Sequence, residues 1–305
     1  MTKTLVKIGA RSSKLSIKHT KIIISAIKRT HIGRFFDFEI VKIDTSGDVP
    51  SRKNGDKINN KGLFTKEIHE KIKNGEIDIA IHSAKDLQVN LANENKIVCV
   101  FKRFDPSDTF FSNKYKSFFN VPISGKIGTS SVRRAEIIRT IRPDIKIVPI
   151  RGNIDSRMEL IGNGILDGII LSDCGPKNLK LRNFKYKFKL DKRLFIPSIA
   201  QGTIVVEGLK DCSNLLLLEA LKIISCKKST FEIEKERQLA RSIGLECGSS
   251  LGFNISANFQ KKECKMNLFF TNQSGEMIRF RDIKSDIKDI DKHLSVIGRK
   301  VQYLM

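Results

Sequence analysis

The chain of 305 residues has no tryptophan and only three tyrosines, and aromatic residues make up 7% of it. This shortage matters because the net charge of +23 by itself favours nucleic acid as a partner. Proteins that bind single strands place aromatic side chains among basic ones, so that bases can stack on them. The most basic stretch, residues 126–157, contains no aromatic residue, and the other lysines and arginines are spread along the whole chain. We therefore expect no nucleic-acid partner, although the charge keeps this class open as an alternative.

Long apolar runs and paired cysteines are also missing. No stretch of 18 apolar residues occurs, which argues against a membrane span, and the first residues lack the apolar core of a signal peptide. The six cysteines form no CxxC pair and no Cys/His spacing typical of a metal site. These absences predict a cytoplasmic protein with free thiols, no metal and no membrane contact.

Hydrophobic periodicity predicts two α/β lobes. Strands are expected at 5–10, 38–43 and 77–81, with helices from Ser13 through Ile27 and through Ile68 and Ile72 between them. This βαβα order restarts near residue 99, with strands ending near 127, 150 and 172 and helices between them. Residues 194–206 are expected to cross back to the first lobe.

After residue 220 the pattern changes. Helical segments surround residues 234–243, two alternating stretches flank a turn at 272–275, and a last helix runs through Ile287 and Leu294. This predicts a smaller α+β domain. We thus expect domain 1 at 1–101 with 202–220, domain 2 at 102–201 and domain 3 at 221–305. The fold class is α/β, with two lobes of mixed sheets and a small third domain.

Charged and hydroxyl residues gather where predicted strands end. Residues 11–13 (RSS), 82–86 (HSAKD), 129–131 (TSS) and 151–153 (RGN) all take such positions. Ligands of open α/β sheets bind at the carboxyl ends of strands, and guanidinium groups suit carboxylates or phosphates equally. Each segment taken alone also fits a helix cap or a solvated turn. Together they predict an anion site, with Asp86 as a carboxylate that faces a cation or forms a surface ion pair.

One cysteine stands in a glycine-rich segment. Cys247 lies in residues 244–250 (GLECGSS), a composition typical of an accessible loop. No histidine stands near it in the sequence, so a Cys-His protease arrangement has little support. A lone cysteine is more often a small buried apolar residue.

Several motifs in the same order resemble the hydroxymethylbilane synthase family, also called porphobilinogen deaminase. The resemblance runs from Ile8 to about Ala257. It rests on residues 8–13 (IGARSS), 61–67 (KGLFTKE), 82–86 (HSAKD), 128–134 (GTSSVRR), 151–153 (RGN) with Arg157, 201–202 (QG), and 236–237 (ER) followed by Cys247.

The resemblance implies a fold, a reaction and a site. The two lobes would be similar to periplasmic binding proteins, and the enzyme would be a monomeric transferase that joins four porphobilinogen molecules into hydroxymethylbilane, with loss of ammonia. Asp86 would be catalytic, and Cys247 would carry a dipyrromethane cofactor through a thioether. Further cofactor contacts would come from Lys85, Ser130, Ser131, Arg133, Arg134 and Arg157, and substrate contacts from Arg11, Ser13, Phe64, Arg151 and Gln201.

The chain departs from the family pattern at five places: Asn59, Gln88, Asn178, Ala200 and Ser250. These departures keep a slow or degenerate synthase open. A second alternative is a non-catalytic two-lobed binder of a polyanion or tetrapyrrole, which would need neither Asp86 nor Cys247.

Overall fold

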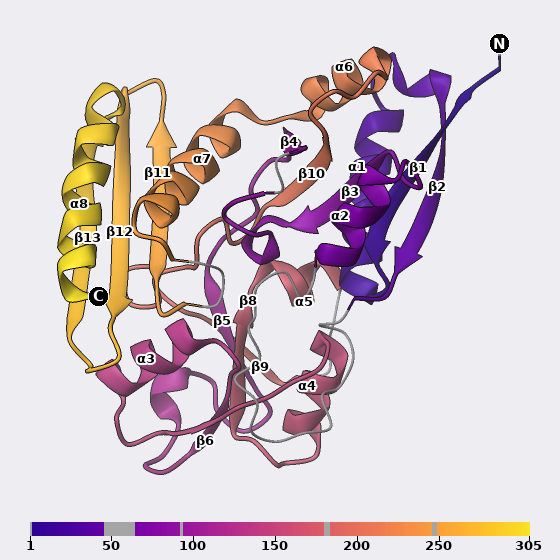
Figure 1. Ribbon diagram of the computed structural model, residues 1–305. Coiled ribbons are helices and arrows are strands. Elements are labelled where there is room, and N and C mark those ends of the chain that lie inside the picture. The colour runs from indigo at the N-terminus through magenta and orange to yellow at the C-terminus, as the bar shows by residue number, and fades with distance from the viewer. Residues whose placement is uncertain (1, 46–64, 92–93, 180–183, 246–248) are drawn as a thin grey trace. The chain divides into compact units, whose positions relative to one another are not determined.

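The structure is a computed structural model that describes residues 2–45, 65–91, 94–179, 184–245 and 249–305. Its described part divides into two compact units, residues 1–104 with 203–230 and residues 105–202 with 231–305. Both units contain β-sheets with helices packed beside them (Figure 1).

The first unit contains a five-stranded sheet in the order β2-β1-β3-β10-β4. Strands β1, β2 and β3 are parallel, whereas β10 is antiparallel to both its neighbours. The strands are β1 (Thr4–Arg11), β2 (Phe36–Ile43), β3 (Ile79–Ser83), β4 (Asn95–Val100) and β10 (Ile204–Leu209).

Helices cover both faces of this sheet. Helices α1 (Lys14–Lys28) and α6 (Leu215–Ile224) bury their apolar sides on one face, which includes Ile79 and Ile81. Helix α2 (Lys66–Lys73) packs on the other face, which includes Ala80. Side chains of a strand alternate between faces, so His82 points to the α2 face and Ser83 to the α1 face.

The second unit contains a sheet of the same design. Its order is β7-β6-β8-β5-β9, where β6 is parallel to β7 and β8, and β5 is antiparallel to β8 and β9. Helices α3 and α4 pack on opposite faces. The elements are β5 (Asp108–Ser112), β6 (Lys126–Gly128), α3 (Val132–Ile141), β7 (Lys146–Val148), α4 (Ile154–Gly162), β8 (Gly168–Ser172), α5 (Cys174–Leu179) and β9 (Tyr186–Lys189).

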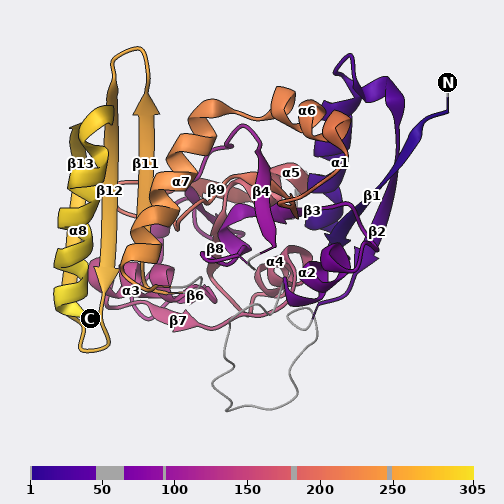
Figure 2. The same cartoon turned by 45° about the horizontal axis from the view of Figure 1, so that its top comes forward.

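The same unit holds an antiparallel sheet in the order β11-β12-β13. Helices α7 and α8 pack against it around Leu239, Leu294 and Val301, and Figures 1 and 2 show α8 running along β13. The elements are α7 (Lys227–Ser242), β11 (Gly252–Asn258), β12 (Glu263–Thr271), β13 (Met277–Asp286) and α8 (Ile290–Leu304). Phe269 of β12 is fully buried in the core that surrounds α3.

The predicted fold class is confirmed: the chain is α/β, with two mixed sheets and a further sheet toward its end. The return crossing is also present, because β10 lies between β3 and β4. Two elements differ from the prediction. Ile287, expected in the last helix, lies in the short 3₁₀ helix η5 (Ile287–Asp289) before α8, and α6 was missed because leucine fills both its buried and its exposed positions. The proposed three-domain boundaries stay a prediction.

Candidate functional site

Two predicted site segments follow neighbouring parallel strands of the first unit. Arg11 ends β1, and Ser13 caps α1 by accepting a hydrogen bond from the Ser16 amide at 3.3 Å. Strand β3, which pairs with β1, runs into the short 3₁₀ helix η3 (Ala84–Asp86). Because both strands end at the same edge of the sheet, Arg11, Lys85 and Asp86 lie at this edge, as the sequence predicts.

The segment around Asp86 is anchored on both sides. The Ala84 amide donates to the Thr203 carbonyl at 2.9 Å, and the Leu87 side chain is fully buried. Asp86 itself is exposed and Lys85 is half-buried. The backbone of this turn is therefore anchored, and it carries an exposed carboxylate next to a lysine.

A buried carboxylate lies on the neighbouring strand β10, where Glu207 pairs with Ala80 of β3. The Glu207 oxygens are 3.1 Å from His69 Nε2 and 2.9 Å from His82 Nε2, and Oε1 also accepts from Asn95 Nδ2 at 2.9 Å. Burial raises the pKa of Glu207, but hydrogen bonds and charge from the two histidines outweigh it and lower this pKa to about 2. The group ties α2, β3, β4 and β10 together.

A third histidine lies on the opposite face of β3. His19 of α1 is 5% exposed, and its Nδ1 is 3.4 Å from the Ser83 hydroxyl. Burial is the main reason that the pKa of His19 is lowered to about 4. The charge of Asp86 raises this pKa and the charge of Lys85 lowers it, but both effects are smaller than that of burial. His19 is therefore neutral near pH 7.

In the second unit, the segment after β6 opens helix α3. Ser131 caps this helix by accepting from the Arg134 amide at 3.4 Å, and Ser130 is exposed beside it. Helix N-termini attract anions, because their first amide groups lack partners within the helix. The predicted cap is thus in place.

The two arginines that follow lie in the interior. Arg133 Nη2 and Arg134 Nη2 donate to the two oxygens of Asp108, at 2.7 and 2.8 Å. Their other Nη atoms donate to the carbonyls of Ile196 and Ile170. The two guanidinium groups hold the pKa of buried Asp108 well below its ordinary value, although burial alone would raise it. Both arginines therefore already have a carboxylate partner within the protein.

Gln201 joins the same cluster. Its Nε2 donates to Asp108 Oδ1 at 2.9 Å and to the Pro106 carbonyl at 2.5 Å, and the residue is fully buried. The preceding residue, Ala200, has φ of +57°, a conformation that favours glycine. Its amide donates to Glu236 Oε2 at 2.6 Å. The segment is thus held from two sides.

The remaining predicted arginines are more accessible. Arg151 is exposed after β7, and Arg157 is half-buried on α4, where its Nε donates to the Gly152 carbonyl at 2.9 Å. Asn153 caps α4 by accepting from the Ser156 amide. These residues lie at the edge where β6 and β7 end, as the sequence predicts.

Two predicted residues, Phe64 and Cys247, lie outside the described residues. Among the other thiols, burial raises the pKa of Cys99 to about 12 and also raises that of Cys264. A raised pKa makes a thiol a poor nucleophile near neutral pH.

The sequence analysis did not identify three buried polar residues: His19, Asp108 and Glu207. Only Asp108 gives a local signal, as a carboxylate that begins an apolar strand.

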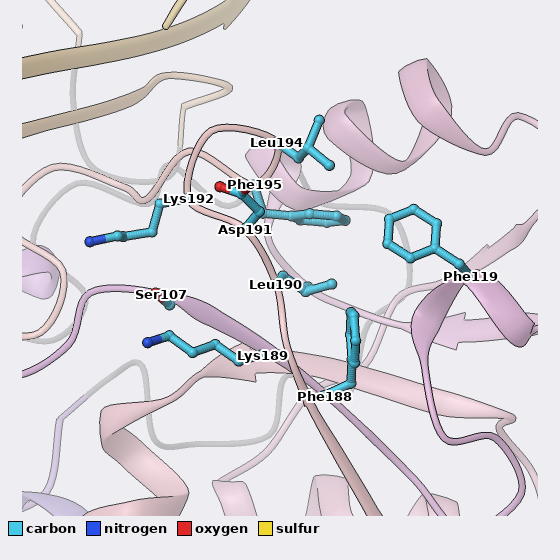
Figure 3. A pocket seen from close by; sticks show the side chains of 9 residues that line it. All are labelled: Ser107, Phe119, Phe188, Lys189, Leu190, Asp191, Lys192, Leu194 and Phe195. Atoms are coloured by element: carbon cyan, nitrogen blue, oxygen red, sulfur yellow. The ribbon is translucent and has the colours of Figure 1, made fainter. Parts of the chain in front are cut away.

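A pocket of about 340 Å³ lies elsewhere in the second unit, with none of the predicted site residues in its wall (Figure 3). Phe119 and Phe188 form one side, and Lys189 and Lys192 extend on the other. Lys189 is paired with Asp105, and the neighbouring Asp191 with Arg193.

In the part of the chain that the structure describes, no cluster of three or more His, Cys, Asp or Glu side chains could hold a metal ion. No helix of that part is both long and apolar enough to cross a bilayer.

Comparison with known families gives one model that covers most of the chain. Residues 6–216 match the model described as porphobilinogen deaminase, dipyromethane cofactor binding domain. This range includes the strands of both five-stranded sheets, apart from the first two residues of β1, and every predicted site residue except Cys247.

Curated relatives match over nearly the whole length. The chain is 34% identical to porphobilinogen deaminase of Rickettsia bellii (strain OSU 85-389) over 300 residues, which cover 98% of each chain. It is 34% identical to the enzyme of the same name from Clostridium novyi (strain NT) over 290 residues, 94% of this chain and 95% of the relative.

Among solved structures, the chain is similar to the methionine-binding protein MetQ, with a TM-score of 0.45 and 12% identity over 76% of this chain and 94% of that one. A putative methionine-binding lipoprotein from Bacillus subtilis gives the same TM-score at 10% identity, covering 74% and 92%. Likenesses at this level decide nothing about ligands.

Proposed function

Since the chain belongs to the porphobilinogen deaminase family, we propose that it makes hydroxymethylbilane from four porphobilinogen molecules on a dipyrromethane primer. In each step the C–N bond of an aminomethyl group breaks and ammonia leaves. A C–C bond then forms to the free α-carbon of the neighbouring pyrrole, and that carbon loses its proton. Water ends the sequence and releases the product. The observation that carries this proposal is the family match over residues 6–216, with its HSAKD segment at the exposed end of β3.

Asp86 is the residue that we assign to the chemistry. Its carboxylate is exposed, fixed by the backbone and flanked by Lys85. Loss of ammonia leaves a cationic azafulvenium on the substrate, and a fixed negative charge next to that cation lowers the barrier. The same carboxylate can accept hydrogen bonds from pyrrole N–H groups and so orient the attacking ring.

The chain carries the dipyrromethane cofactor-binding domain of its family. When bound, the cofactor supplies the pyrrole carbon to which the first substrate unit is joined. Its carboxylates fit the donors of the second unit: the amide and hydroxyl of Ser130 and the hydroxyl of Ser131 at the start of α3, and the guanidinium groups of Arg151 and Arg157. We assign Lys85, Arg11 and Ser13 to carboxylates at the edge of the first sheet.

We also assign three buried residues to the site: Arg133, Arg134 and Gln201. All three are buried around Asp108, so their contact with a ligand would add to bonds that they already make. Their main contribution is then to hold the start of α3 and the 200–202 segment in place. We propose that Phe64 contacts a pyrrole.

Cys247 is proposed as the attachment point. The raised pKa values of Cys99 and Cys264 support this assignment, because those thiols are poorly suited to form a thioether. We further propose that the enzyme works as a cytoplasmic monomer without nucleic acid. A non-catalytic binder is not favoured by the family match.

The experiment is the intact mass of the purified protein, made in cells with a working pyrrole pathway. The wild type should be heavier than its sequence by one dipyrromethane unit, and Cys247→Ser should have the bare mass. Cys226→Ser, a change of the half-buried thiol near α7, is the matched control and should keep the added mass. A wild type of bare mass that does not consume porphobilinogen would overturn the proposed function. Added mass on Cys247→Ser would overturn only the choice of thiol.

A further inference from the structure

The strongest unexplained group near Asp86 is a histidine on the neighbouring helix. His19 lies in the second turn of α1, with its side chain turned to the sheet and 5% exposed. A buried histidine needs a polar partner, since an unpaired ring nitrogen in the interior costs free energy. Ser83 provides one, at 3.4 Å from Nδ1.

Ser83 connects this ring to the turn that carries Asp86. It is the last residue of β3 and precedes η3 directly, and its side chain points to the α1 face of the sheet. The ring is also close enough for the charges of Asp86 and Lys85 to act on it. His19 therefore faces the one segment of the first unit to which we assign the reaction.

The charge state of the ring decides what it can do there. A protonated imidazole would be a cation next to Asp86 and would compete with a cationic substrate for that carboxylate. Burial prevents this by keeping the ring neutral at the pH of the cell. A neutral imidazole can still donate one hydrogen bond and accept another, so it can orient neighbouring groups while leaving their charge unchanged.

We propose, on the basis of the proposed function, that His19 is a positioning residue for Asp86, acting through Ser83 as an uncharged imidazole. In this arrangement Nδ1 accepts from the Ser83 hydroxyl and the proton resides on Nε2, because the partner of one ring nitrogen fixes the proton on the other. The ring holds the start of the 84–86 turn, and the Asp86 carboxylate keeps its full negative charge for the substrate.

The first test requires no activity. In protein with ¹⁵N-labelled histidine, the ring shifts of His19 should show the neutral Nε2–H tautomer at pH 7 and a titration midpoint near pH 4. The Asp86 charge raises this midpoint, so Asp86→Asn should move it to lower pH, whereas Asp37→Asn, which changes an exposed carboxylate of the same unit, should leave it unchanged. A midpoint that is the same in Asp86→Asn and wild type would overturn the proposal.

The second test uses porphobilinogen consumption. His19→Leu should lower kcat by about tenfold with little change in KM, and His19→Gln, which retains a donor and an acceptor, should recover most of it. Ile23→Val is the packing control, since Ile23 is a fully buried residue of the same helix and loses no polar contact. It should change thermal stability only.

Different results would refute the proposed function and the role of His19. A wild type that does not consume porphobilinogen refutes the proposed function, whatever the rings show. A normal kcat in folded His19→Leu refutes the role of His19 alone. If His19→Leu does not fold, His19→Gln and the titration of His19 in Asp86→Asn still decide.

Discussion

At the scale of single residues, arginines of two family motifs, residues 128–134 and 151–153, have different surroundings. Arg133 is 2% exposed and bonded to Asp108, whereas Arg151 is exposed at the edge of the sheet. Removing one partner of a buried ion pair leaves an unpaired charge in the interior, which is costly. Charges at exposed positions contribute little to stability.

Arg133→Leu should therefore lower the free energy of unfolding by about 3–5 kcal/mol, while Arg151→Leu should leave it nearly unchanged and reduce porphobilinogen turnover. Denaturant unfolding and turnover, measured on the same samples, check both statements. Arg139→Leu is the matched control, because Arg139 is an exposed residue of the same helix and is paired with Glu136. Equal stability of the Arg133 and Arg139 variants would contradict the expectation.

Asp86→Asn should lower turnover by on the order of 10²-fold or more, because one well-placed electrostatic group is typically worth that much. Its melting temperature should stay close to that of the wild type, since the carboxylate is exposed. Asp37→Asn, an exposed carboxylate paired with Lys3 in the same sheet, should keep full turnover. A near-normal rate in Asp86→Asn would remove this residue from the mechanism.

Ala200→Gly should stabilise the protein by about 1 kcal/mol, because a residue with a Cβ is strained at φ of +57° and glycine is not. Calorimetry should show a melting temperature higher by a few degrees. Ala220→Gly makes the same change at a buried position within helix α6 and should destabilise by a similar amount. A lower melting temperature for Ala200→Gly would show that the segment carries no strain.

At the scale of elements, Glu207 and the three side chains around it join one helix and three strands. The pKa of Glu207 is depressed from 4.5 to about 2, so its ionised form stabilises the fold. A depressed carboxyl contributes this stability in full above its unfolded pKa, and the contribution is lost as the pH falls through the folded value.

Glu207→Gln should therefore destabilise the protein at pH 7 by about 3 kcal/mol, and its difference from the wild type should shrink between pH 4.5 and pH 2. Chemical unfolding at a series of pH values measures this difference. Glu219→Gln, at an exposed position paired with Lys222, should show no such dependence. A constant difference across that range would mean that Glu207 is not ionised in the folded protein.

Elements with local signals could be predicted from the sequence, and contacts between distant residues could not. The Ser13 cap, the Ile68 and Ile72 repeat and the hairpin at 272–275 are short-range patterns, and the structure contains all three. Asp108 and its arginines, or Glu207 and its histidines, meet only because the sheets bring them together. The family motifs still predicted correctly which edge of each five-stranded sheet carries the polar residues, because these motifs directly follow the carboxyl ends of strands.

At the scale of the whole molecule, both five-stranded sheets have the same design: three parallel strands, then one antiparallel strand from elsewhere in the chain, then an outer strand. In the first sheet the inserted strand is β10, which follows the entire second lobe in the sequence. In the second sheet it is β5, which precedes the other strands. The chain thus passes between the two compact units more than once, and each unit consists of two separate segments of the sequence.

The position of β10 sets an order of events during synthesis. Strands β3 and β4 have no direct pairing with each other and meet only through β10, so the first sheet stays incomplete until residues 204–209 have left the ribosome. At about 5–20 residues per second, the wait after β4 lasts roughly 5–20 s. During that time the facing edges of β3 and β4 are open to pairing with other strands. We therefore expect the first lobe to be most prone to wrong strand pairing at this stage, whereas the second lobe can complete its five-stranded sheet as soon as β9 emerges.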